Sequence, residues 1–181
     1  MKSIISIMIF TLSGVFVSAQ SVFDVTLQNV MTDQSVTLKE YSDSKGVVIV
    51  FMSVKCPYAK YYESRLQKLV EDYRDKGISF LMINSNNSES KEMMKCQVKK
   101  LNTKYLVDDS KQLANLLGAK KSPEVFLLKS DGIKYYSGAI DDNPQVATDV
   151  KVNYLKDAID AMLAGKSNPQ DSGRPVGCMI K

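Results

Sequence analysis

The stretch VVIVFMSVKCPYAKYYESRL, residues 47–66, joins an unbroken apolar run to a helical pattern. The run from Val47 to Met52 is continuously apolar and rich in β-branched residues, which is typical of a strand buried on both faces of a sheet. Pro57 suits the first position of a helix, because its missing N–H needs no partner there. Cys56 therefore lies where a central strand turns into a helix. The predicted helix ends at Gly77, and its apolar face consists of Tyr62, Leu66, Leu69, Val70 and Tyr73.

The rest of the chain alternates between strand and helix patterns. Strands that alternate with helices and finish in a hairpin predict an α/β fold, with a mostly parallel sheet, an antiparallel edge and helices on both faces. We expect one domain over residues 20–165 and a polar tail over residues 166–181. The sequence predicts a hairpin of residues 23–27 and 36–38, then a strand over 78–83, then a helix that is capped by Asn86 with Glu89 and ends at about Leu101. The next predicted helix is capped by Asp109 or Ser110 and carries Leu113, Leu116 and Leu117. A hairpin of residues 125–128 and 133–136 around Gly132 and a helix over 152–164 complete the predicted elements.

Residues 1–19 have the pattern of a secretory signal peptide. Lys2 supplies the positive end, Ile4 to Val17 supplies the apolar run, and Val17-Ser18-Ala19 supplies the small residues of a cleavage site. The alternative is a membrane anchor, but the run is shorter than the roughly 20 residues that a span needs. We expect a mature chain that starts near Gln20, has no membrane span and is secreted or periplasmic, where disulfides persist.

The composition excludes several classes of chemistry. The chain has no histidine, which rules out Ser-His and Cys-His catalytic pairs and histidine metal ligands. Its three cysteines, Cys56, Cys96 and Cys178, are not spaced like zinc ligands. The 24 basic and 20 acidic side chains are interspersed, which gives no argument for a nucleic-acid or membrane partner. We therefore expect no metal and no cofactor.

Cys56 is the strongest candidate for chemistry. The first N–H groups of a helix and the helix dipole favour a thiolate, and Lys55 and Lys60 add positive charge nearby, so we expect a lowered thiol pKa. A thiolate is the nucleophile in disulfide exchange and in peroxide reduction. The alternative interpretation is a buried structural cysteine at the end of a strand.

Several segments, in order, resemble the redoxin branch of the thioredoxin superfamily, the group of alkyl hydroperoxide reductase and thiol-specific antioxidant proteins. They are FMSVKCPYAKYYESRL (51–66), GISFLMINSN (77–86), SPEVFLL (122–128), YYSGAIDD (135–142), LKDAIDAMLAGK (155–166) and PVGCMIK (175–181). The resemblance implies a thioredoxin-like fold with a central mixed sheet, helices on both faces and an N-terminal β-hairpin extension. It also implies that Cys56 is the working cysteine and that Ser122-Pro123 is a cis-proline loop beside it, whose backbone can pair with an extended thiol substrate.

The chain departs from the family pattern at Ser53, which stands where the first cysteine of C-x-x-C would be. Cycling within a local dithiol is therefore impossible. A hydroxyl three residues before the cysteine resembles peroxiredoxins, in which it orients the peroxide, but their upstream proline is Ile49 here and their arginine has no identified counterpart. The resemblance implies a peroxide or a protein thiol or disulfide as substrate, and an external thiol as reductant.

A lone nucleophilic thiol needs a second thiol as resolving partner. Cys178 lies on the tail beside Gly177, and the chain from Gly165 onward is long enough to return across a small domain, so we favour Cys178. Cys96 is the alternative resolving cysteine, and a Cys96–Cys178 bridge that leaves Cys56 free is a third arrangement. We predict an exported thiol oxidoreductase, with a redox-inactive binding module of the same fold as the alternative function.

Overall fold

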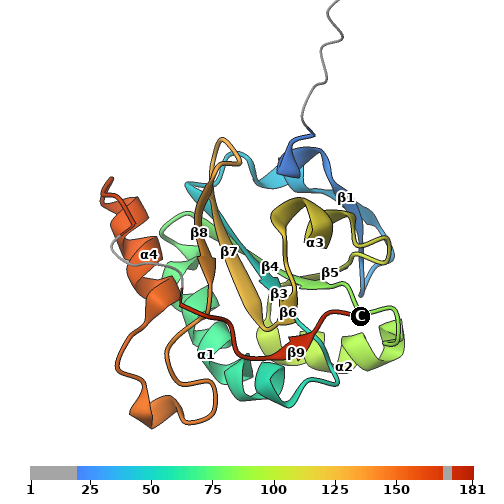
Figure 1. Cartoon of the computed structure of the whole chain (residues 1–181). Helices are drawn as coiled ribbons and strands as arrows, with labels where there is room; N and C mark the ends of the chain where they lie inside the picture. Colours follow the sequence, from blue (N-terminus) through green and yellow to red (C-terminus); the bar gives the residue numbers. More distant parts are fainter. Residues whose placement is uncertain (1–19, 169–172) are drawn as a thin grey trace, which may run out of the picture.

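The computed structural model describes residues 20–168 and 173–181, so the predicted signal peptide over 1–19 lies outside the described residues. Its centre is a seven-stranded sheet in the order β2-β1-β5-β4-β3-β7-β8 (Figure 1). The strands are β1 (Thr26–Asn29), β2 (Ser35–Thr37), β3 (Gly46–Phe51), β4 (Ile78–Asn84), β5 (Lys104–Val107), β7 (Glu124–Lys129) and β8 (Lys134–Gly138). A separate two-stranded sheet pairs β6 (Lys121–Ser122) with β9 (Cys178–Met179).

The sheet is mixed. Strands β3, β4 and β5 run parallel, whereas β1 is antiparallel to both β2 and β5, and β7 is antiparallel to both β3 and β8. The prediction of a mostly parallel sheet was therefore wrong, because the N-terminal hairpin β1-β2 joins the sheet through β5 and adds antiparallel pairs on that side. The N-terminal hairpin is confirmed, but its first strand is Thr26–Asn29 and not residues 23–27, because Val22–Asp24 form a 3-10 helix. The hairpin β7-β8 is confirmed.

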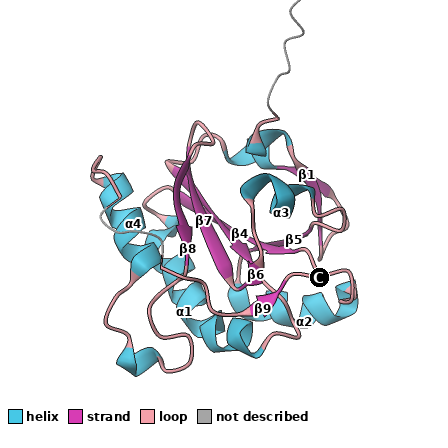
Figure 2. Ribbon diagram, in the orientation of Figure 1, coloured by secondary structure: helices cyan, strands magenta, loops and turns pink. Residues whose placement is uncertain are grey.

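Helices cover both faces of the sheet, because successive side chains of β3 point to opposite sides (Figure 2). Val48 and Val50 pack into a core with α1 (Pro57–Arg74), α2 (Lys91–Leu101) and α4 (Tyr154–Leu163). Val47, Ile49 and Phe51 pack on the other face, beneath α3 (Gln112–Leu117) and the N-terminal segment around Phe23. The continuous apolar run thus serves two cores, as the sequence predicts.

Two predicted helix caps were wrong. Helix α2 begins at Lys91, and its N-cap is Ser90, whose hydroxyl accepts from the Met93 N–H, so Asn86 does not cap it. Glu89 points away from α2 and binds the loop before α1 instead.

Helix α3 has a cap that is remote in sequence. Its N-cap residue is Lys111, in the left-handed conformation, which lets the buried carboxylate of Asp108 accept from the N–H groups of Leu113 and Ala114. Neither Asp109 nor Ser110 fills that role.

Strand β5 has no counterpart among the predicted elements, since only Tyr105 to Val107 of its four residues are apolar. Within residues 20–168 and 173–181, no helix combines the length and the apolarity that crossing a bilayer requires.

Candidate functional site

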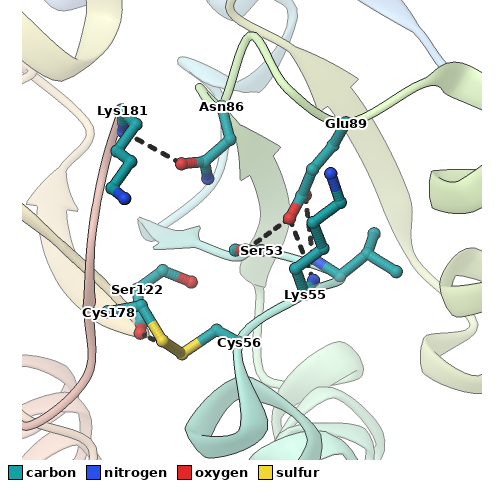
Figure 3. Close-up of a disulfide and its surroundings, with 9 residues drawn as sticks. Ser53, Lys55, Cys56, Asn86, Glu89, Ser122, Cys178 and Lys181 are labelled. Carbon is teal, nitrogen blue, oxygen red and sulfur yellow. Dashed lines mark hydrogen bonds between the residues drawn. A yellow bond between two sulfur atoms is a disulfide. The ribbon is translucent and has the colours of Figure 1, made fainter.

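Cys56 is the N-cap residue of α1, with Pro57 as the first helical residue, as predicted. Its own N–H donates to the Ser53 carbonyl at 3.3 Å, so the chain turns sharply between β3 and α1. The Cys56 side chain is 1% exposed and forms a disulfide with Cys178, with 5.9 Å between the two Cα atoms. Cys178 is partly buried, and Figure 3 shows the disulfide beside Ser122.

The loop before β7 lies against this disulfide. The Ser122–Pro123 peptide bond is cis, and the Ser122 carbonyl oxygen lies 3.1 Å from the Cys56 sulfur. On the same short segment, β6 pairs with β9, in the register Ser122 opposite Cys178. The predicted site residues Cys56, Pro123 and Cys178 therefore come together, although they lie far apart in the sequence.

Ser53, at the other end of the turn, is bound to a carboxylate. Its hydroxyl donates to Glu89 Oε1 at 2.6 Å, and both side chains are buried. The same carboxylate accepts from the backbone N–H groups of Val54 and Lys55, each at 2.9 Å, and from Asn84 Nδ2 at 2.7 Å. Glu89 thus holds every residue of the turn between Ser53 and Lys55.

Glu89 is held in its charged form by these contacts. Burial alone would raise the pKa of its carboxyl, but the hydrogen bonds from Ser53, Asn84 and the Lys55 and Val54 amides outweigh that and lower it below its usual value. The ammonium of Lys55 is exposed and donates to the Ser88 carbonyl at 2.6 Å, which ties the turn to the segment that carries Glu89.

Cys96 is not part of this arrangement. It lies exposed on α2 as a free thiol, so the Cys96–Cys178 bridge considered from the sequence is not formed.

Sequence reasoning missed Glu89 and Asn84 as site residues. Asn84 is the last residue of β4 and Glu89 follows that strand. Because β4 runs parallel to β3, the carboxyl ends of the two strands meet at one edge of the sheet. The polar residues at the end of the second buried strand could therefore have indicated that Asn84 and Glu89 lie beside the turn at Cys56.

Comparison with known proteins agrees with this geometry. Residues 19–137 match the AhpC/TSA family. An uncharacterized conserved protein from Geobacillus kaustophilus has 30% identity and a TM-score of 0.81, with 90% of each chain covered. A hypothetical protein from Sinorhizobium meliloti has 30% identity and a TM-score of 0.80, covering 93% of this chain and 96% of that one.

A more distant structure shares the fold. It is a secreted disulfide oxidoreductase of Mycobacterium tuberculosis, homologous to DsbE of E. coli, with 14% identity, a TM-score of 0.60, and coverage of 80% of this chain and 97% of that one. No curated protein sequence matches the chain. With its mixed sheet, its cysteine at the start of α1 and its cis-proline loop, the chain has a thioredoxin-like fold and belongs to the AhpC/TSA family.

Proposed function

We propose that this chain is an exported thiol–disulfide oxidoreductase in which Cys56 is the nucleophile and Cys178 is the resolving cysteine. The observation that carries the proposal is the Cys56–Cys178 disulfide at the start of α1, against the Ser122–Pro123 loop. The shared fold with a secreted disulfide oxidoreductase of M. tuberculosis supports it.

Cys56, as the nucleophile, is the cysteine that exchanges with the partner. A thiolate of a partner dithiol attacks the sulfur of Cys56, the Cys56–Cys178 bond breaks, and Cys178 leaves as a thiolate. The second thiol of the partner then attacks its own sulfur in the mixed disulfide, and Cys56 leaves as a thiolate. The start of α1 favours that thiolate, because its first N–H groups receive no side-chain cap. The partner is oxidised to a disulfide and the protein is reduced to two thiols.

The reverse direction uses the same atoms. The Cys56 thiolate attacks a partner disulfide, and Cys178 then attacks the sulfur of Cys56 and expels the partner as a dithiol. The closed Cys56–Cys178 bond is restored, and an external thiol reduces it again.

A disulfide fits this site better than a peroxide as the electrophile. The Ser53 hydroxyl, which could orient a peroxide, instead donates a hydrogen bond to Glu89. The guanidinium of Arg65 is bound to the Asp141 carboxylate at 2.6 Å and to the Asn143 and Pro144 carbonyls. The Ser53 hydroxyl and the two terminal nitrogens of Arg65 are therefore already bound to other oxygens.

Export is proposed from the pattern of residues 1–19. When the full-length gene is expressed in a bacterial host, we expect a mature chain that begins near Gln20 in the exported fraction. Intact-mass measurement of the purified protein checks this. A chain that keeps residues 1–19 and stays in the membrane fraction would contradict it.

The exchange activity is tested with the mature protein as a catalyst of insulin reduction by dithiothreitol. We expect acceleration by the unmodified chain, no acceleration by Cys56→Ser, and unchanged acceleration by Cys96→Ser, the matched control for loss of a thiol. With Cys178→Ser we expect a disulfide-linked adduct of Cys56 with insulin, visible by mass spectrometry.

The same variants separate the rival functions. Faster consumption of hydrogen peroxide than of insulin disulfides, dependent on Cys56, would make the chain a peroxidase instead. Equal and negligible rates for all four proteins with both substrates would support the redox-inactive binding module and overturn the proposal.

A further inference from the structure

The end of the chain is bound as an extended strand along the loop that precedes Pro123. Strand β9 pairs antiparallel with β6, with Ser122 opposite Cys178 and Lys121 opposite Met179. One residue further on, the Ile180 N–H donates to the Lys120 carbonyl at 3.0 Å. Backbone pairing therefore holds the tail on this side without requiring particular side chains.

A second segment binds Lys181, the last residue of the tail. The Lys181 N–H donates to Asn86 Oδ1 at 3.0 Å, and the Asn87 N–H donates to the Lys181 carbonyl at 3.2 Å. Asn86 is itself fixed, because its N–H donates to Asn84 Oδ1 at 2.9 Å. We call the two edges, Lys120–Ser122 and Asn86–Asn87, the tail site (Figure 3).

The tail leaves polar groups of this site without partners. Within the part of the chain that the structure describes, Asn86 Nδ2 and Ser122 Oγ are buried and have no hydrogen-bond partner. Both residues are more than nine-tenths buried, with 8% of Asn86 and 0% of Ser122 exposed. Buried polar groups are ordinarily paired, so these two groups can accept a partner from another segment bound in the same place.

The site also selects the residue that precedes the cysteine. A Cβ added to Gly177 would lie 2.1 Å from the Ser122 carbonyl oxygen, 2.6 Å from its carbon and 3.0 Å from the Pro123 nitrogen. These are backbone atoms of a paired segment, which cannot move aside as a flexible side chain can. A segment that docks in this register therefore needs glycine directly before its cysteine.

We propose that the tail site binds an extended segment of a partner protein that contains the dipeptide Gly-Cys, and that residues 177–181 occupy the site while the Cys56–Cys178 bond is closed. The proposal rests on the proposed function, because Cys56 must form a disulfide with the partner. Reduction of the Cys56–Cys178 bond frees the tail to leave, and the partner segment then takes its place along Lys120–Ser122.

The test uses two synthetic peptides, Val-Gly-Cys-Met-Ile-Lys and Val-Ala-Cys-Met-Ile-Lys, each with its cysteine linked to thionitrobenzoate. The protein is the full mature chain with Cys96→Ser and Cys178→Ser, in which Cys56 is the remaining thiol. The Cys56 thiolate attacks the peptide sulfur, an S–S bond forms between them, and the bond to thionitrobenzoate breaks. The released coloured thiolate reports the rate.

We expect the glycine peptide to react about tenfold faster than the alanine peptide, because the added methyl group overpacks against backbone. Adding Gly177→Ala to the protein excludes its own tail from the site, so the glycine peptide should then react several-fold faster still. The comparison of the two peptides does not depend on that third substitution.

Two further measurements separate the outcomes. Dithiobis(nitrobenzoate), which needs no strand site, should react with Cys56 whichever residue stands at position 177; no reaction would overturn the proposed function. Reaction with this reagent, but equal rates for the two peptides, would overturn the inference alone. Disulfide-linked dimers formed on oxidation of the Cys96→Ser chain would assign the site to the tail of a second copy and overturn the partner-protein assignment.

Discussion

Glu89 organises the turn that presents Cys56 through its hydrogen bonds to Ser53, Val54 and Lys55. Its two oxygens accept from four donors, two of which are backbone N–H groups of the turn. Ser53 therefore has a structural partner in the position where a C-x-x-C protein would have its first thiol. Glu89 and Ser53 together fix the start of α1 without a second cysteine.

This role predicts the effect of Glu89→Gln. Glutamine has a single carbonyl oxygen, so two of the four donors would lose their acceptor and remain buried. We expect a loss of about 2–3 kcal/mol in the free energy of unfolding at neutral pH, measured by urea titration. Glu71→Gln, on the exposed face of α1, is the matched control and should change the stability by less than about 0.5 kcal/mol.

The pH dependence of this difference tests whether the charge of Glu89 matters. The folded-state pKa of Glu89 is lowered, so its contribution is complete above the unfolded value of about 4.3 and is lost as the pH falls through the folded value. The unmodified chain and Glu89→Gln should therefore converge in stability in strong acid. The same difference at neutral and acidic pH would contradict a role for the carboxylate charge.

At the scale of elements, the sequence predicted the strands and helices that are specified by their own residue pattern. The apolar run of β3 and the three- and four-residue spacing of α1 predict a buried strand and an amphipathic helix, and both form. The cap of α3 could not be predicted in this way, because a left-handed Lys111 brings Asp108 back to the helix from several residues away.

The two-residue strands β6 and β9 show the same limit for the candidate site. Each exists only because it pairs with the other, and neither has a periodicity of its own. From the sequence, Cys178 could be favoured over Cys96 only by the length of the tail. The site residues Cys56 and Pro123 were predicted because a strand-to-helix junction and a family resemblance mark them, whereas Glu89 and Asn86 were read as helix caps.

At the scale of the whole molecule, the Cys56–Cys178 bond ties the end of the chain to its centre. The two residues are 122 positions apart in the sequence, and strand β9 pairs with β6 and with none of the seven strands of the main sheet. A bond that closes so long a loop restricts the unfolded chain strongly. The redox state should therefore set the stability of the domain as well as the occupancy of the tail site.

Cys178→Ser should lower the free energy of unfolding by about 2–4 kcal/mol relative to the oxidised chain, because the unfolded state regains the entropy of the open loop. In excess reductant the two proteins should have equal stability, since neither then has the bond. Cys96→Ser, which removes a free thiol on the surface of α2, should match the unmodified chain in both conditions. Urea titration in the presence and absence of reductant measures all three.

A difference that persists in reductant would mean that serine at position 178 disturbs the packing of β9 itself. Equal stability of the Cys178→Ser and unmodified chains under oxidising conditions would mean that the bond does not restrain the domain.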